Sequence, residues 1–351
     1  MASQMCNYQG SRVVISELCH DVEMTPSKYE AFGNYYRATT VSVDNYDTAI
    51  TIEPGNGSIL DTVRLLRNNA QRTKTALQQL AFPTSSAKDI QFGIRNAVII
   101  GFMVDCDSKD DHSKTYRLWD TLTRWDANRS LEEFMQSSFP TFSPFHRKDW
   151  ASSPKAWKLR RRYKIRFIPT NDLLQHLVYD KQNLTVKIFH QTAWLKSQLR
   201  CTSKYSIDTN FAKSLQLGTL PPQLVLETLV SIYYILFPVA EDSRTAKIVA
   251  KLIRKRGFDP DFRVDDFGSI RELAEDFECR YWSHRLRIIQ EISTEPPATN
   301  RFLSWIEWHT TERNALTVAI IGVFLAAFFG MLGCIIGIAQ SILAYLAWKY
   351  P

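Results

Sequence analysis

A long stretch without charge, near the carboxyl end, constrains this chain more than any other feature of its sequence. The run from Ala315 to Trp348 contains no Asp, Glu, Lys or Arg. A helix of about 20 apolar residues is already long enough to cross a bilayer. A buried core helix would be shorter and would carry a polar stripe, whereas here only Thr317, Gln340 and Ser341 interrupt the apolar surface. The sequence therefore predicts a membrane-spanning segment.

The run is longer than one simple crossing requires. As a single helix it would measure roughly 50 Å, against a hydrocarbon core of about 30 Å. Either one long helix passes through both headgroup layers, or the chain forms a hairpin near Gly330–Gly333. Small residues recur every three or four positions without a change of phase at that point, which favours one helix. They are Ala315, Ala319, Gly322, Ala326, Gly330, Gly333 and Gly337, followed by Ser341 and Ala344.

A stripe of small residues allows a second helix to approach closely, and Gly333 and Gly337 form a GxxxG pair within it. We predict a self-association seam along this stripe. Two other interpretations stay open: Gly and Ala are common in membrane helices, and the stripe could pack on another protein. Aromatic residues at both ends predict an interfacial belt, formed by Trp305, Trp308, Tyr345 and Trp348.

The position of the run predicts how the chain is oriented. Only Lys349, Tyr350 and Pro351 follow it, and the first thirty residues hold no apolar run that resembles a secretory signal. We therefore expect a tail-anchored, single-pass protein, inserted after translation, with its body in the cytosol. Arg301 and Arg313 before the run agree with the positive-inside tendency. No feature specifies which organelle membrane receives the anchor.

The residues before the anchor predict an α+β protein. We expect a mixed α/β domain at 1–140, a Pro-rich basic linker at 141–160, a βαβα and helical domain at 161–295, and a juxtamembrane helix with the anchor at 296–351. The expected strands are 39–53, 96–104, 163–168 and 185–190. The expected helices are 61–80, 116–135, 171–179, one that ends at 199, 224–237, 243–256 and 269–292.

Composition excludes several classes of protein. The mean hydropathy of −0.23 is too low for a polytopic transporter, and the hydrophobic content of 45% is too high for a disordered chain. The six cysteines show neither a CxxC pair nor regular spacing, which predicts reduced thiols in a cytosolic body.

The formal net charge of +7 is concentrated in one stretch. Between Arg147 and Arg166 there are nine basic residues and one acid. We predict a patch that contacts anionic lipid headgroups. A nucleic-acid surface is less favoured, because an anchor confines the protein to a membrane, and a solvated linker is the plain alternative. The patch consists of Lys155, Lys158, Arg160, Arg161, Arg162, Lys164 and Arg166.

The search for catalytic and metal motifs predicts no such site. The chain has no P-loop, no complete GxGxxG, no HExxH and no GxSxG. The acidic segment Asp105–His112 lacks the glycine and distal Glu of an EF-hand. Two further polar groups have ordinary interpretations. Glu307, His309 and Glu312 look like a polar collar at the membrane interface, and Asp276–Arg285 looks like part of an amphipathic helix. We predict no catalytic residue, no metal and no cofactor, and lean against an enzyme.

The second half of the chain resembles a large group of fungal membrane proteins without an assigned activity. The similarity is carried by RRYKIRFIPTNDLLQHLVYD, IFHQTAWLKSQL, LPPQLVLETLVSIYYILFP, FECRYWSHRLRIIQEI and the anchor, over about 161–348. The resemblance implies a membrane-anchored α/β and helical architecture, and suggests an accessory role in metabolite biosynthesis. A weaker similarity links Gly330-Met331 to the Gly-Met-Asn motif of CorA-type magnesium channels, but Leu332 replaces the Asn.

Together these features favour a membrane-tethered interaction or accessory module. Its expected partners are the lipid bilayer, another copy of the chain through the seam, and a protein that the sequence does not identify. The alternatives are an oligomeric CorA-like cation channel and a membrane-tethered enzyme or accessory factor in metabolite biosynthesis. A channel would need a polar pore face, and the run offers only three polar side chains for one.

Overall fold

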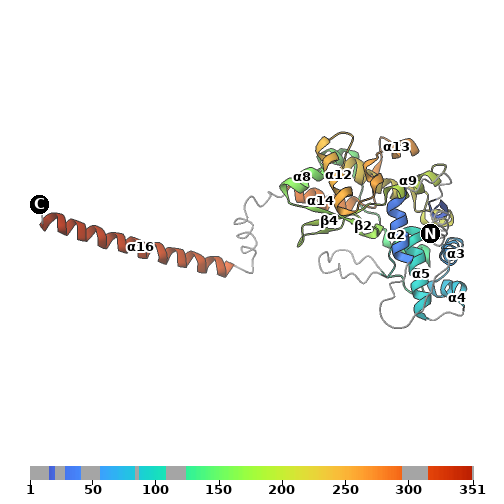
Figure 1. Ribbon diagram of the computed structural model, residues 1–351, viewed down its shortest axis with the longest axis horizontal. Coiled ribbons are helices and arrows are strands. Elements are labelled where there is room, and N and C mark those ends of the chain that lie inside the picture. Colours follow the sequence, from blue (N-terminus) through green and yellow to red (C-terminus); the bar gives the residue numbers. More distant parts are fainter. Residues whose placement is uncertain are drawn as a thin grey trace, which may run out of the picture. The chain divides into compact units, whose positions relative to one another are not determined.

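The computed structural model describes residues 16–19, 28–40, 56–83, 87–107, 124–294 and 315–349. The chain divides into two compact units, 1–295 and 296–351. The first unit, the body, is mixed α and β with small sheets, and the second contains one long apolar helix (Figure 1). This confirms the predicted fold class. The expected strand at 39–53 lies mostly outside the described residues.

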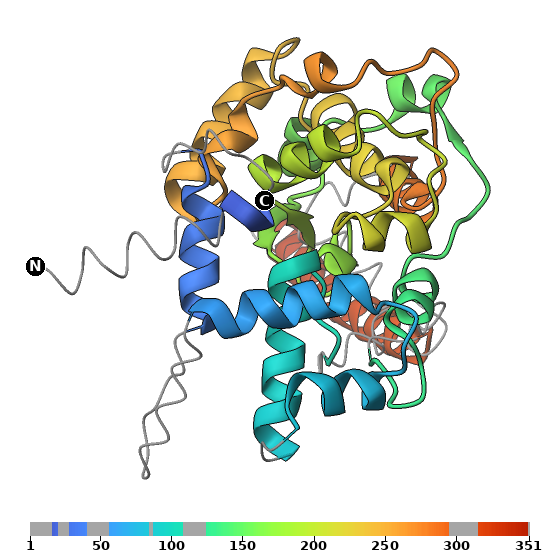
Figure 2. The same cartoon turned by 90° about the vertical axis from the view of Figure 1, so that its right-hand side faces the viewer.

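The amino-terminal part of the body is helical throughout its described residues. Its helices are α2 (Glu30–Thr40), α3 (Asn56–Asn68), α4 (Lys74–Ala81), α5 (Ala87–Phe102) and α6 (Leu131–Ser138). Helix α3 lies across α5 (Figure 2), and Gly101 allows a close approach, because a Cβ there would lie 3.1 Å from a Val63 methyl. Helix α6 begins at a capping box between Ser130 and Glu133.

Helix α5 corrects one sequence prediction. The apolar run at 96–104 was expected to form a strand, but its residues form the second half of α5 and end in a turn. A continuous apolar run has the same appearance in a buried strand and in a helix buried on all sides. Ala97, Val98 and Ile100 are fully buried and the other residues from 96 to 102 are buried as well, so this half of the helix has no exposed polar face that could have identified it.

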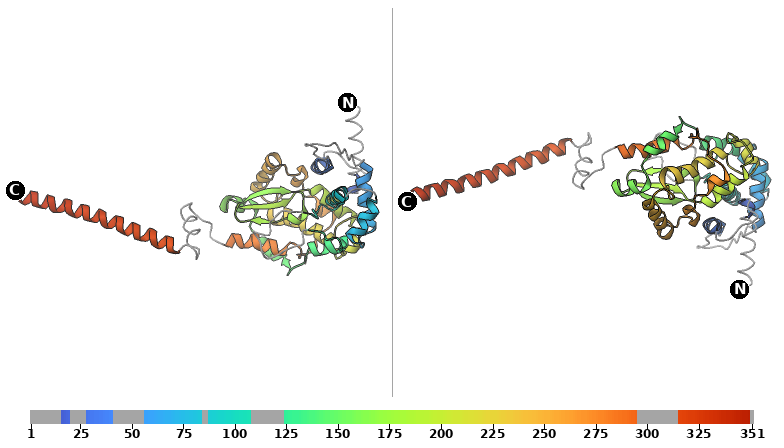
Figure 3. Two further views of the ribbon diagram at one scale, coloured as in Figure 1. Left: turned by 90° about the horizontal axis from the view of Figure 1, so that it is seen from below. Right: turned by 90° about the horizontal axis from the view of Figure 1, so that it is seen from above.

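The carboxyl-terminal part of the body contains a small sheet surrounded by helices. Strand β2 (Arg166–Thr170) pairs in parallel with β4 (Thr185–Phe189), and β3 (Tyr179–Asp180) pairs antiparallel with β4. Figures 1 and 3 place this sheet at the opposite end of the body from α3. The expected strand at 185–190 is confirmed, and the one at 163–168 is confirmed with a shift toward the carboxyl end.

The body contains further helices and strands, and some of them match the predicted ones. They are β1 (Phe145–His146), α7 (Arg147–Ser152), α8 (Ala156–Arg162), η2 (Leu173–Gln175), α9 (Thr192–Cys201), α10 (Phe211–Gln216), α11 (Pro222–Val230), η3 (Ser231–Leu236), α12 (Ser243–Arg256), η4 (Pro260–Arg263), α13 (Phe267–Ile270), β5 (Glu278–Cys279) and α14 (Ser283–Thr294). The expected helices at 224–237 and 243–256 and the one ending at 199 are confirmed. The helix expected at 61–80 forms as α3 and α4, with Thr73 capping the second.

Three expected helices are wrong in part or in whole. At 171–179 only one 3₁₀ turn forms, because Asp172 caps the backbone N–H of Leu174. In 116–135 the described residues become helical only at Leu131. In 269–292 the central residues are extended and irregular, because their backbone pairs with β1 and with a buried carboxylate described below.

The segment predicted as a linker at 141–160 contains β1, α7 and most of α8. Strand β1 pairs with β5 through Phe145 and Cys279, and Trp150 stacks on Tyr234 at 6.5 Å. The predicted boundary between two domains of the body at this segment stays a prediction. The core of the body is one cluster of buried apolar side chains that includes residues from both sides of this segment.

Candidate functional site: the membrane helix and a basic surface

The long apolar helix α16 runs from Ala315 to Lys349 without a break. The chain does not turn at Gly330–Gly333, so the hairpin alternative is wrong. Within the described residues, Leu325–Leu346 is the one helix long and apolar enough to cross a membrane, with a mean hydropathy of 2.0 and none of its window buried. An uncovered apolar surface of this length requires a cover, either lipid or protein.

Helix α11 shows what a core helix of this chain looks like. It is shorter and less apolar, since it includes Gln223 and Glu227, and eight of its side chains are buried, among them Leu224, Leu226 and Leu229. In α16, by contrast, the side chains of Phe328, Phe329 and Ile338 are about 60% exposed. The two helices therefore differ in composition and in burial: α16 is the more apolar of the two and yet the more exposed.

The predicted helix-packing seam lies on α16 and has no partner among the residues that the structure describes. A Cβ placed on Gly330, Gly333 or Gly337 would meet nothing within 4 Å. A shallow groove of about 620 Å³ lies beside Gly337 and is lined also by Cys334 and Ser341. The side chains of Ala315, Ala319 and Gly322 and of Trp348 fall outside the described set, as do Trp305 and Trp308 altogether. Ala326 of the predicted seam and Tyr345 of the predicted interfacial belt lie on α16, and both side chains are exposed.

The predicted headgroup patch lies on α8 and at the start of β2. Arg161, Arg162, Lys164 and Arg166 are exposed, and Lys158 and Arg160 are half-buried. Lys164 and Arg166 also donate to nearby backbone carbonyls but are exposed. Lys155 differs in that its Nζ donates a 3.0 Å hydrogen bond to a distant segment, at the carbonyl of Tyr234. Burial lowers the pKa of Lys155. Six of the seven predicted residues are thus available to an external anion, and Lys155 serves the body.

Helix α12 extends this basic surface with cations that no run in the sequence singles out. It contacts both α8 and β2 (Figure 1). Between Ser243 and Arg256 there are six basic residues and no acid. The guanidinium of Arg244 lies 4.7 Å from the centre of the Trp157 ring and joins the two helices. The cationic residues of α12 are Arg244, Lys247, Lys251, Arg254, Lys255 and Arg256, all exposed.

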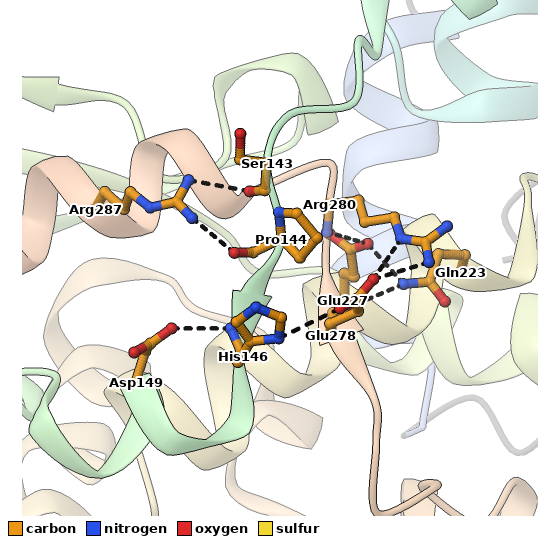
Figure 4. A network of polar contacts seen from close by, with 9 residues as sticks. All are labelled: Ser143, Pro144, His146, Asp149, Gln223, Glu227, Glu278, Arg280 and Arg287. Carbon is orange, nitrogen blue, oxygen red and sulfur yellow. Dashed lines mark hydrogen bonds and ion pairs between the residues drawn. The ribbon is translucent and has the colours of Figure 1, made fainter.

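The interior contains a polar network that resembles a catalytic centre but has a structural role. Figure 4 shows Glu227 beneath the segment that follows β5. Its carboxylate is fully buried and accepts hydrogen bonds from the backbone N–H groups of Arg280, Tyr281 and Trp282 at 2.7, 2.8 and 3.1 Å. Gln223 donates a fourth at 2.8 Å. Burial raises the pKa of Glu227 to about 7, against the opposing effect of these hydrogen bonds. Glu227 therefore holds an irregular segment on α11.

The same region contains further polar contacts near the surface. His146 Nδ1 lies 3.3 Å from Glu278, which also forms an ion pair with Arg280 at 2.8 Å (Figure 4). Asp149 accepts the backbone N–H of His146, and Arg287 donates to the carbonyl oxygens of Ser143 and Pro144. A surface depression of about 540 Å³ beside this group contains cations and acids in mixture, which does not define a ligand.

A buried histidine and serine lie within hydrogen-bonding distance of each other. His176 Nε2 is 2.7 Å from Ser231 Oγ, and His176 Nδ1 accepts the backbone N–H of Phe189 at 3.2 Å. Nδ1 is therefore the unprotonated nitrogen, and Nε2 donates its proton to the serine. A general base needs the opposite arrangement, with a free lone pair facing the hydroxyl. Burial lowers the pKa of His176 well below its usual value, so the pair is a core contact.

Other buried charges are also engaged within the body. Lys196 Nζ forms ion pairs with Asp261 at 2.8 Å and Asp266 at 2.6 Å, with no exposed side-chain area. Arg285 donates to the carbonyl oxygens of Leu174 and His176. Within the part of the chain that the structure describes, no group of three or more His, Cys, Asp or Glu could hold a metal ion.

The remaining sequence candidates fall into three cases. Asp105 in the acidic segment accepts two hydrogen bonds from Arg95, at 2.9 and 2.7 Å, and the segment beyond Asp107 lies outside the described residues. Glu307, His309 and Glu312 lie outside them as well. The group at 276–285 is not one amphipathic helix, since α14 begins only at Ser283.

Comparison of this chain with protein-family models, with curated proteins and with solved structures finds no match. Neither the resemblance to fungal membrane proteins nor the one to CorA-type channels is supported by these comparisons. Function must therefore be argued from α16 and from the surface of the body.

Proposed function

We propose that this chain is a single-pass membrane protein in which α16 spans the bilayer and the body acts in the cytosol as an interaction or accessory module. The observation that carries the proposal is the apolar surface of α16, which is exposed among the residues that the structure describes. A helix of 35 residues measures roughly 50 Å, enough for the hydrocarbon core and both headgroup layers. Tyr345 and Trp348 then lie near the far interface, where aromatic side chains are favoured.

Two features support a body that faces the cytosol. Cys106 and Cys279 are free thiols buried in the core, as expected of a protein folded in a reducing compartment. The basic surface of α8 and α12 suits the cytosolic leaflet, which carries the anionic lipids. An accessory role fits an interior in which Glu227, His176 and Lys196 all serve packing contacts.

We also propose that α16 pairs with a second copy through the seam of Gly330, Gly333 and Gly337. The support is the close approach that these glycines permit and the groove beside Gly337. No observation favours a conducting pore, because Ser341, one of the few polar side chains of α16, donates its hydroxyl to the carbonyl of Gly337.

Topology tests the main proposal. A glycosylation sequon added after Pro351 should be modified in microsomes, and the native sequons at Asn56, Asn128 and Asn183 should stay bare. A matched variant, Ile335→Arg with Ile338→Arg, should lose both the modification and resistance to carbonate extraction. Wild-type protein extracted by carbonate would overturn the anchor. Glycans on the body would overturn its orientation.

A further inference from the structure

We propose that α8, α12 and the start of β2 form one docking surface that seats the body on an anionic bilayer. This inference rests on the proposed function, since it assumes that α16 holds the chain at a membrane. The surface combines two basic segments that are far apart in sequence, 156–166 and 243–256, neither of which contains an acid. Its cations are Lys158, Arg160, Arg161, Arg162, Lys164 and Arg166 together with the six of α12.

The cations of α12 are arranged as a face rather than scattered. At about 100° per residue, five of them fall within an arc of about 100°. The buried side chains Thr245, Val249 and Leu252 lie on the other side of the helix. Neighbours three or four residues apart on this face carry like charges, which destabilises a helix. An external anionic surface would remove this repulsion.

Helix capping explains only part of this charge. Cations in the last turn, such as Lys255 and Arg256, complement the helix dipole. Arg244 stands in the first turn, where the helix dipole disfavours a cation. The neighbouring acid, Asp242, caps the helix by accepting the backbone N–H of Arg244. Within the described residues, no ion pair involves a cation of α8 or α12. These charges therefore remain available to a partner.

The surface lies at the point where the chain leaves the body for the anchor. The hydroxyl of Tyr163, which directly follows α8, donates a 2.8 Å hydrogen bond to the carbonyl of Ser293 in the last turn of α14. Residues 295–314 connect this point to α16 and can span at most about 70 Å. An anchored chain therefore keeps α8 within reach of the headgroups.

Apolar side chains at the edge of the surface favour a bilayer over a nucleic acid. Ile168 on β2 and Leu184 at the tip of the β3–β4 hairpin are 37% and 38% exposed. The carbonyl of Leu184 accepts the backbone N–H of Arg166 at 2.9 Å, which places this tip beside the basic residues. Single-stranded nucleic acids stack on exposed aromatic rings, but Trp157 is half-buried beneath Arg244. Aliphatic tips among cations suit the headgroup layer.

Hydrogen exchange on the full-length protein in vesicles tests the surface. Backbone amides of 156–166 and 243–256 should exchange at least about fivefold more slowly in vesicles containing phosphatidylserine than in phosphatidylcholine alone. A factor of about five is the gain in membrane binding expected from a single cation near an anionic surface. High salt should remove the difference, because screening weakens it. The salt series needs no variant, so it stands even if a substitution impairs folding.

Charge reversal provides the matched comparison. Lys247→Glu, Lys251→Glu and Arg254→Glu together should weaken docking about a hundredfold, as three such cations would. Arg72→Glu, Lys204→Glu and Lys213→Glu make the same change in charge at exposed positions on other elements and should leave the protection intact. Equal exchange on neutral and anionic vesicles, or equal loss in both triple variants, would overturn the proposal.

Two further outcomes separate this inference from its premise. Protein that carbonate removes from the vesicles would show that the anchor itself has failed. Protein that resists carbonate but shows no lipid-dependent protection would refute the docking surface alone. Protection of the same segments by an RNA oligonucleotide, but not by phosphatidylserine, would assign the surface to nucleic acid and likewise overturn the proposal.

Discussion

The hydroxyl of Tyr163 donates a hydrogen bond to the carbonyl of Ser293, and this contact ties the basic helix α8 to the last turn of α14. Two segments separated by 130 positions thereby meet where the chain leaves the body. Arg162 lies over the Tyr163 ring at 5.8 Å, so the same residue also contacts the basic surface. The junction therefore joins the basic surface to the last described turn before the anchor connection.

Removing the Tyr163 hydroxyl should loosen the junction without unfolding the body. We expect Tyr163→Phe to lower the free energy of unfolding by about 1 kcal/mol, the typical contribution of one hydrogen bond. Amide exchange should rise in the last turn of α14 and stay unchanged in α11. Tyr205→Phe, at an exposed position, is the control and should change neither quantity. Equal exchange in α14 for both variants would show that the hydrogen bond does not hold the junction.

Glu227 should be a main determinant of stability in the carboxyl-terminal part of the body. Glu227→Gln turns an amide NH₂ toward a site that presents three backbone donors, so at least one donor loses its acceptor. We expect a loss of about 2–4 kcal/mol in chemical denaturation, the range for leaving buried polar groups unpaired. The nearby exposed Glu275→Gln should cost almost nothing. Similar stability of the two variants would contradict the proposed role.

Local patterns in the sequence predicted some elements accurately. Helix α12 has the expected bounds because its apolar positions recur with helical period and because both ends are marked, by the Asp242 cap and by Gly257 with φ of 70°. Strand β4 is a short β-branched run, which is equally readable. Where apolar side chains surround the whole element, as around Ile100 in α5, periodicity could not distinguish helix from strand.

The basic surface illustrates a different limit. Arg161 and Arg162 were recognised because consecutive cations stand out in a sequence. The cations of α12 are spaced among apolar residues, so in the sequence this segment has the pattern of any amphipathic helix. Its part in a basic surface follows only from the packing of α8 against it. The contact between Arg244 and Trp157 depends on the tertiary fold. No local pattern contains such a contact between distant segments.

The stability of the body should depend on pH through His190. Its Nδ1 accepts the backbone N–H of Asp259 at 2.9 Å, and burial lowers the pKa of His190 to about 4. The unfolded chain binds a proton near pH 6.5, so His190 contributes stability above that pH and loses it as the pH falls toward 4. The neighbouring Asp259 has the opposite effect in part of this range, because burial raises its pKa to about 7.

A variant isolates the contribution of His190 from that of Asp259. Asn at position 190 can accept the same backbone N–H but does not titrate. The advantage in unfolding free energy of wild type over His190→Asn should shrink by up to about 3 kcal/mol between pH 7 and pH 4. Urea unfolding across this range measures the difference. A difference that is constant with pH would mean that His190 is not held neutral in the fold.

The seam on α16 should be sensitive to side-chain volume. Gly330→Leu with Gly337→Leu adds bulk where no described residue lies within 4 Å, so the helix itself should tolerate the change. If two copies meet at these glycines, the substitution separates their backbones and dimers that survive in detergent should disappear. The combined variant Gly322→Leu, Gly330→Leu and Gly337→Leu should have the same effect on crosslinking and gel mobility.

The control for the seam adds bulk on the opposite side of the helix. Ala339 is exposed on α16 and lies about half a turn away from the glycine stripe. Ala339→Leu should therefore leave the dimer intact while it changes the composition of α16 in the same direction. If both substitutions weaken the dimer equally, association depends on general properties of the helix. If neither does, the seam does not mediate self-association, and the glycines serve contacts with another membrane protein or none.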